Sequence, residues 1–172
     1  MFGDTFFSVK VIMACYAAPL LVAAAFDFWT YRIPNVVTGT FALLYFACVL
    51  YFFRGMGIDW LSHIGACMAV LVVGLGLFYF NIFGGGDIKL ISAVALWIGF
   101  NRELVVFLLV AGVAGGALTL ILLGIRNGLS RIPVAFPAYV PVALQAQSPI
   151  PYGVAVVAGA LWVVFAIPFL LA

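Results

Sequence analysis

Charged residues are scarce in this chain, and their scarcity excludes most classes of protein. Only 7% of the 172 residues are Asp, Glu, Lys or Arg, whereas 68% are hydrophobic. Soluble domains carry about 25% charged residues because their surfaces face water. The net charge of +2 is scattered and forms no basic cluster, so nucleic acid is not an expected partner. The composition therefore predicts an integral membrane protein whose residues face lipid or other helices.

Residues that bind metals or form disulfides are also few. The chain has one histidine and three cysteines, and Cys15, Cys48 and Cys67 each lie inside an apolar run, far from any CxxC spacing. Neither a zinc site nor a disulfide framework is indicated. Free cysteine in such a run is expected to pack as a small hydrophobe. We predict no metal and no other cofactor.

Long apolar runs, in contrast, are abundant. At about 20 residues per membrane span, they predict helices at residues 6–26, 36–53, 60–80, 88–100, 104–125 and 152–171. In the fifth helix, Gly112 and Gly116 have the spacing that lets helix backbones approach closely. The connection at residues 126–151 contains five prolines and is expected to be irregular. The predicted fold is all-α: a polytopic membrane protein of about six transmembrane helices, forming one domain over residues 1–172.

The most informative polar stretch is FGGGDIKL, residues 83–90, between two apolar runs. An acidic residue such as Asp87 at the start of a membrane segment is a candidate functional residue. Two predicted spans separate Asp87 from Asp27, so both carboxylates should emerge on the same membrane face. A rise of 1.5 Å per residue places both acids just beneath the headgroups.

The orientation of this face follows from the basic residues. Four of the seven cationic residues are predicted to lie on it: Arg32, Lys89, Arg126 and Arg131. The positive-inside rule then favours the cytoplasmic side. Arg126 and Arg131 are expected to act as interfacial anchors or, alternatively, to contact acidic residues or lipid near a substrate. His63 is expected near the opposite face and is not a catalytic candidate.

Two neighbouring carboxyl groups predict acid–base chemistry. In a low-dielectric setting both cannot ionise at low cost, so one keeps its proton. The ionised group can take a proton from water while the protonated group polarises a peptide carbonyl, as in an aspartic protease. Glycines have no Cβ and let another backbone lie close, so the glycine run could hold a substrate strand or could simply form a turn.

Two other classes of protein remain open on these residues. In a small proton- or cation-coupled transporter, Asp27 and Asp87 would relay protons or coordinate a cation. A non-catalytic assembly partner of a secretion machine is the other alternative.

Three short motifs carry a family resemblance. GGGDIK, ending at Lys89, resembles the GxGDxK motif of type IV prepilin leader peptidases. Asp27 followed by IPN, ending at Asn35, resembles the first catalytic aspartate of that family and its tail. PYG, ending at Gly153, is similar to a third signature. The resemblance follows the order and spacing of the whole chain.

The resemblance implies a GxGD-type intramembrane aspartic endopeptidase of the bacterial inner membrane, with its active site facing the cytoplasm. Its substrates would be pilin precursors, cleaved between a short basic leader and a hydrophobic helix. Asp27 and Asp87 would be the catalytic dyad. The implied loop-shaping or substrate-binding residues are Gly84, Gly85, Gly86, Lys89, Pro34 and Asn35.

The chain also departs from the longer members of that family. Those members carry a cytoplasmic domain with paired CxxC motifs and methylate the new N-terminus, whereas this sequence has neither feature, so methyl transfer is not predicted. The chain looks like the short, peptidase-only form found with tight-adherence (Flp-type) pili, and a related form that processes archaeal preflagellins stays an alternative. The implied partners are a prepilin, membrane lipid and the pilus assembly machinery; a homo-oligomer is left open.

Overall fold

The computed structural model describes residues 2–52, 58–129 and 149–166, which form six α-helices and no strand. The helices are α1 (Phe2–Thr30), α2 (Asn35–Phe52), α3 (Trp60–Tyr79), α4 (Gly85–Ile98), α5 (Arg102–Leu129) and α6 (Tyr152–Ala166). Helices α1, α2, α3 and α5 are long and apolar enough to cross a membrane, and α6 is a shorter apolar helix. The predicted all-α, multi-pass membrane fold is confirmed.

Among the helix boundaries that differ from the prediction, three affect the candidate site or the long connection. Helix α1 continues to Thr30 rather than ending at residue 26, so Asp27 lies in its last turn. Helix α4 begins at Gly85, so Asp87 lies in its first turn. Helix α5 continues to Leu129, and the start of the connection predicted to be irregular is therefore helical. The rest of that connection up to residue 148, and the predicted end of the sixth span, lie outside the described residues.

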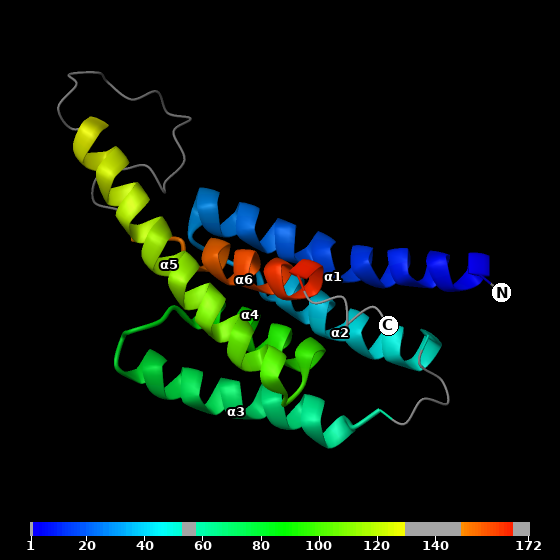
Figure 1. The fold of residues 1–172 in the computed structure, drawn as a ribbon. Helices are drawn as coiled ribbons and strands as arrows, with labels where there is room; N and C mark the ends of the chain where they lie inside the picture. Colours follow the sequence, from blue (N-terminus) through cyan, green and yellow to red (C-terminus); the bar gives the residue numbers. More distant parts are fainter. Residues whose placement is uncertain (1, 53–57, 130–148, 167–172) are drawn as a thin grey trace.

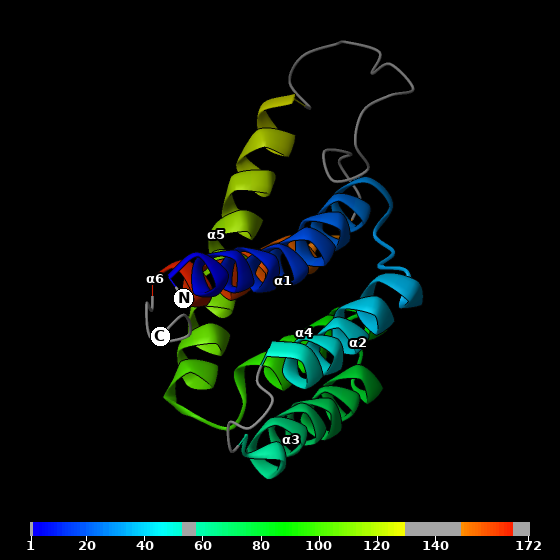
Figure 2. The ribbon, with the colours of Figure 1, turned by 90° about the vertical axis from the view of Figure 1, so that its right-hand side faces the viewer.

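The short helix α4 forms the centre of the bundle. It packs against α2, α3, α5 and α6, while α1 packs against α2 and α6 (Figure 1). Eight of its fourteen residues are buried, because neighbours cover it on several sides. Turned by 90°, the bundle shows α4 between α2 and α3, and α5 rising beyond the other helices (Figure 2). The fourteen residues of α4 rise about 20 Å, and this length separates the residues at its two ends.

Aromatic residues fix the middle of the bundle. The rings of Phe41 and Trp97 are stacked with centroids 5.3 Å apart, and Tyr16 meets both edge-on. The Trp97 indole donates to the Phe41 carbonyl at 3.0 Å, and the Tyr16 hydroxyl donates to the Ala160 carbonyl at 3.2 Å. Such pairs contribute about 0.5–1.5 kcal/mol each beyond area burial. This cluster joins α1, α2, α4 and α6 into one scaffold.

Helices α5 and α6 approach closely, but not through the predicted glycines. A Cβ added to Gly112 or Gly116 would meet no atom of the described residues within 4 Å. A Cβ on Gly159 would instead lie 2.9 Å from the Cβ of Ala111, and one on Gly115 would lie 3.3 Å from the Tyr152 ring. The prediction was wrong by one position: the row of small residues that allows close packing is Ala111 and Gly115.

His63 lies at the end of α4 that is far from Asp87. Its Nδ1 atom is 2.9 Å from the Leu96 carbonyl oxygen, and its ring packs against Gly99. Gly99 has a φ of 83° and ends α4, a conformation that favours glycine. The histidine is separated from the acidic residues by the length of α4, as the count of spans predicted.

Candidate active site

Asp27 is presented by the end of α1. Tyr31 follows the helix with a φ of 53°, in the left-handed region, and its N–H donates to the Asp27 carbonyl at 3.0 Å. This ends the helix in the manner of a left-handed cap. Pro34 then starts the next helix, because its carbonyl accepts the Val37 N–H at 3.0 Å. The side chain of Asp27 is only 5% exposed.

The carboxylate of Asp27 faces the first turn of α6. Backbone N–H groups of Gly153 and Val154 point at it, and N–H groups in a first helical turn have no partner within their own helix. They also form the positive end of the helix dipole. The Oδ2 atom of Asp27 is buried and has no hydrogen-bond partner of good geometry among the described residues. Such an atom in a native site calls for an explanation, for example a bound water or a catalytic role.

Asp87 also lies at the amino end of a helix, in this case its own helix α4. It is the third residue of the helix, and its carboxylate accepts the backbone N–H of Gly84, the residue before the helix. This contact is one half of a capping box. A Cβ on Gly84 would lie 3.0 Å from the Oδ2 atom of Asp87, so the glycine leaves room for the carboxylate.

The two carboxylates are close enough for their charges to interact. Each lies at the amino end of a different central helix, Asp27 at α6 and Asp87 at α4. Both helix dipoles therefore stabilise negative charge at this end of the bundle. Two acids that interact in this way titrate as a pair rather than separately.

Ile33 connects the three sequence motifs. A Cβ on Gly86 would lie 3.5 Å from the Cβ of Ile33, and one on Gly153 would lie 2.9 Å from its Cδ1 atom. Both glycines thus let the Ile33 side chain fill the space between α4 and α6. The Nζ atom of Lys89 donates to the Oδ1 atom of Asn35 at 2.8 Å. This exposed hydrogen bond also joins the GGGDIK motif to the IPN motif.

The glycine run does not act as one unit. Gly84 lies beside Asp87 and Gly86 packs on Ile33, whereas Gly85 faces Phe78 of α3, with 3.6 Å from an added Cβ to the ring. Of the three glycines, only Gly84 lies beside an acidic side chain.

Arg126, expected from the sequence to be an interfacial anchor or to contact acidic residues or lipid near a substrate, makes contacts that the sequence did not predict. The Arg126 side chain is only 7% exposed and donates to the Pro149 carbonyl at 2.9 Å and to the Tyr31 hydroxyl at 3.4 Å. The Tyr31 hydroxyl also donates to the Pro149 carbonyl, at 2.8 Å. This Arg126–Tyr31–Pro149 cluster ties the turn after Asp27 to the segment that leads into α6. The only local signal for this cluster was the position of an arginine at the end of an apolar helix. Arg131, which was predicted together with Arg126, lies outside the described residues.

Within the described residues, no group of three or more His, Cys, Asp or Glu side chains gathers where it could hold a metal ion. The arrangement contains instead a pair of interacting carboxylates, backbone N–H donors from the starts of α6 and α4 and a bare glycine backbone. These parts suit proton transfer between a carboxyl pair and a water molecule.

Comparison with known proteins gives one match. The sequence model of the type IV leader peptidase family matches residues 14–120, a range that contains Asp27, the IPN motif and the glycine run. No curated protein and no solved structure matches the chain. The matched range covers most of the described helices and both acids.

Proposed function

Because the chain belongs to the type IV leader peptidase family, we propose that it is an aspartic endopeptidase that removes the leader from Flp-like prepilins. In this proposal it acts as a single membrane domain at the cytoplasmic face of the bacterial inner membrane. The observation that carries the proposal is the pair formed by Asp27 and Asp87, whose charges interact. Within this pair, the buried Oδ2 atom of Asp27 has no hydrogen-bond partner among the described residues.

The reaction follows from the pair holding one proton. The ionised carboxylate takes a proton from water, and the hydroxyl group attacks the peptide carbonyl while the protonated carboxyl donates to the carbonyl oxygen. Collapse of the resulting gem-diol returns a proton to the leaving amine and restores the shared proton. No covalent intermediate with the protein is formed.

The glycine backbone supports a role in holding the substrate. Gly84 is exposed and has an extended conformation, with a φ of −72° and a ψ of 142°. A strand of substrate could lie against it without meeting a side chain, directly beside Asp87. The proposal covers peptide hydrolysis alone; the methyl transfer of longer family members is not part of it.

The test is co-expression of the chain with a pilin precursor of the Flp type. We expect wild type to yield mature pilin, and we expect Asp27→Asn and Asp87→Asn each to leave the precursor uncut while the protein stays in the membrane at its normal level. A transporter would leave the precursor at full size with wild type as well, and either aspartate change would alter an ion or solute flux instead.

A further inference from the structure

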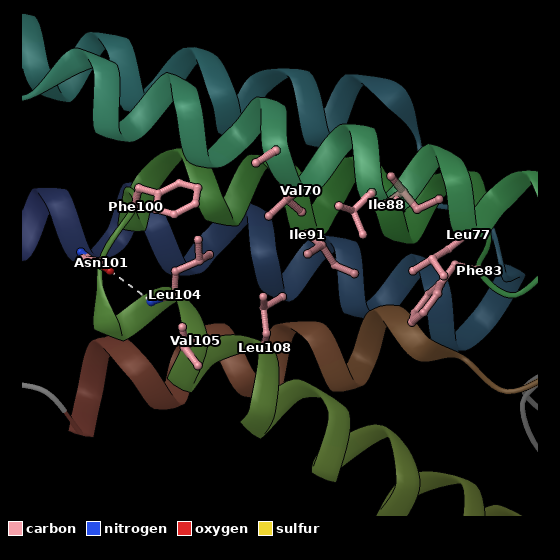
Figure 3. A pocket seen from close by; sticks show the side chains of 13 residues that line it. Val70, Leu77, Phe83, Ile88, Ile91, Phe100, Asn101, Leu104, Val105 and Leu108 are labelled. Carbon is pink, nitrogen blue, oxygen red and sulfur yellow. Dashed lines mark hydrogen bonds between the residues drawn. The ribbon is translucent and has the colours of Figure 1, made fainter.

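A long apolar groove lies between α3, α4 and α5 (Figure 3). It has a volume of about 370 Å³. Ile88 and Ile91 of α4 form its floor, residues of α3 such as Val73 form one wall, and residues of α5 such as Val105 form the other. We call it the α3–α5 groove.

One end of the groove is formed by residues next in sequence to the candidate active site, although neither Asp27 nor Asp87 lines it. Phe83, one residue before the glycine run, lines one end, and Ile88, the neighbour of Asp87, lines the floor there. Phe100 and Asn101, beyond the last residue of α4, line the other end (Figure 3). The groove therefore follows α4 over its fourteen residues, which rise about 20 Å.

Among the described residues, the lining offers no free polar side chain to a ligand. Asn101 is the one polar side chain among them, and both ends of its amide are already used: Nδ2 donates to the Ile98 carbonyl at 2.9 Å and Oδ1 accepts the Leu104 N–H at 3.1 Å. A polar or charged occupant would lose its hydrogen bonds to water without replacement. The groove is suited only to hydrocarbon.

The opening of the groove is on the side that lipid would cover. Its walls belong to α3 and α5, both long enough to cross a membrane. Val73 and Val105 at its edges are 64% and 57% exposed. An occupant can therefore enter sideways from the bilayer without crossing water.

We propose that the α3–α5 groove binds one face of an apolar helix of the substrate, with the scissile bond at the Asp87 end; this inference rests on the proposed peptidase function. A helix that lies along α4 for about 20 Å makes about four turns. It would present large side chains at i, i+3, i+4 and i+7 to the groove, as in other complexes of a helix in a groove.

Continuity with Asp87 favours a peptide over a lipid chain as the occupant. A peptidase must hold the substrate on at least one side of the bond it cuts, and this apolar groove begins at Phe83 and Ile88, which flank the glycine run and Asp87 in the sequence. A lipid acyl chain would also suit the apolar lining, but binding of a lipid gives no reason for the groove to have one end near the two acids.

Two adjacent valines on α3 provide a matched test. Val73 lines the groove, whereas Val72 does not, and the two are almost equally exposed, at 64% and 63%. Val73→Trp should obstruct the groove, and Val72→Trp should place the same bulk toward lipid. The assay uses the full chain in lipid nanodiscs and two synthetic substrates: a basic leader followed by an apolar helix, and a short peptide that ends a few residues after the cleaved bond.

For the helix-bearing substrate, we expect Val73→Trp to lower kcat/KM about tenfold, the size of one lost interface anchor, mainly through KM. Val72→Trp should equal wild type, and the short peptide should be cut equally by all three proteins. Unchanged cleavage of the helix-bearing substrate by Val73→Trp would overturn the groove proposal. So would an equal loss on both substrates, because that result means damage to the acids.

A photo-crosslinker separates failure of the groove from failure of the peptidase. Benzoylphenylalanine is placed at Val105 in the groove or at the exposed Val113 outside it, in a chain that also carries Asp87→Asn. We expect the helix-bearing peptide to be captured at Val105 and not at Val113. Capture of lipid alone at Val105 would overturn the proposal. If wild type cuts neither peptide, the peptidase function fails, and capture at Val105 still decides what the groove binds.

Discussion

Asp27 and Gly153 are packed so closely that a Cβ added to the glycine would lie 2.7 Å from the Oδ2 atom of the aspartate. The two residues come from opposite ends of the chain, and their contact brings the amino end of α6 onto the end of α1. The absence of a side chain at Gly153 thus leaves the space that the Asp27 carboxylate occupies.

Gly153→Ala is expected to abolish or strongly reduce precursor cleavage. The added methyl group must displace the Asp27 carboxylate or the start of α6, and overpacking of this kind costs about 1–3 kcal/mol. Cleavage in membranes is measured beside the amount of protein retained there. Gly112→Ala is the control, because an added Cβ meets none of the described residues within 4 Å and alanine is the better helix former.

Cleavage of the precursor by Gly153→Ala at the wild-type rate would contradict the close packing of the Asp27 carboxylate against Gly153. Gly112→Ala should leave both cleavage and protein level unchanged or slightly raise the level.

The Arg126–Tyr31–Pro149 cluster is expected to hold Asp27 in place for catalysis. Tyr31→Phe removes one donor to the Pro149 carbonyl, and Arg126→Gln removes the charge and the longer reach of the guanidinium. Each change removes one of the two hydrogen bonds to the Pro149 carbonyl, and a hydrogen bond from a charged group contributes more, about 1.5–3 kcal/mol, than one from a neutral hydroxyl. We expect kcat to fall about tenfold or more in Arg126→Gln, less in Tyr31→Phe, and KM to change little in both.

Steady-state kinetics of the purified proteins measure this difference. Arg102→Gln serves as the control because Arg102 is exposed at the other end of α5. A rise in KM alone would contradict the positioning role and would indicate that Arg126 contacts the substrate.

Lys89 and Asn35 are expected to act as one unit. Their hydrogen bond of 2.8 Å is exposed, so its contribution to stability should be below about 1 kcal/mol. Lys89→Met and Asn35→Ala should each reduce cleavage slightly, and the double variant should be no worse than the more impaired single variant. Additive losses in this double-mutant cycle would mean that the two side chains act independently.

The carboxyl pair predicts a bell-shaped dependence of kcat/KM on pH. At low pH both groups are protonated and the site lacks a base; at high pH both are ionised and it lacks an acid. Initial rates across the pH range, with enzyme stability checked at each pH, provide the measurement. A rate that keeps rising with pH would indicate that no protonated carboxyl group is needed.

Much of the fold could be predicted because apolar runs of span length leave few alternatives in a membrane. The count of spans between Asp27 and Asp87 also predicted one shared end of the bundle. The boundaries were harder. Helix α1 was expected to end at residue 26 because the apolar run ends there. Asp27 lies inside the helix, at the end where the helix dipole disfavours negative charge. The N–H groups of α6 compensate that charge, and they come from a distant part of the sequence.

The start of α4 was missed for a related reason. Glycines are poor helix formers, so residues 85 and 86 were expected to form a loop. Asp87 caps the Gly84 N–H and allows the helix to begin earlier. On α5, glycine spacing alone could not show which face meets α6, and Gly112 was chosen where Ala111 makes the contact. The burial of Arg126 depends on Pro149, which no local pattern connects to it.

The most direct test of the account is the initial rate of precursor cleavage by purified wild type, Asp27→Asn, Asp87→Asn and the double variant. Residues that act as a unit show grossly non-additive effects. We therefore predict that each single change lowers the rate by at least about a thousandfold, with the double variant no slower than the singles. Near-normal cleavage by either single variant would contradict the claim that the two carboxyl groups share the hydrolysis.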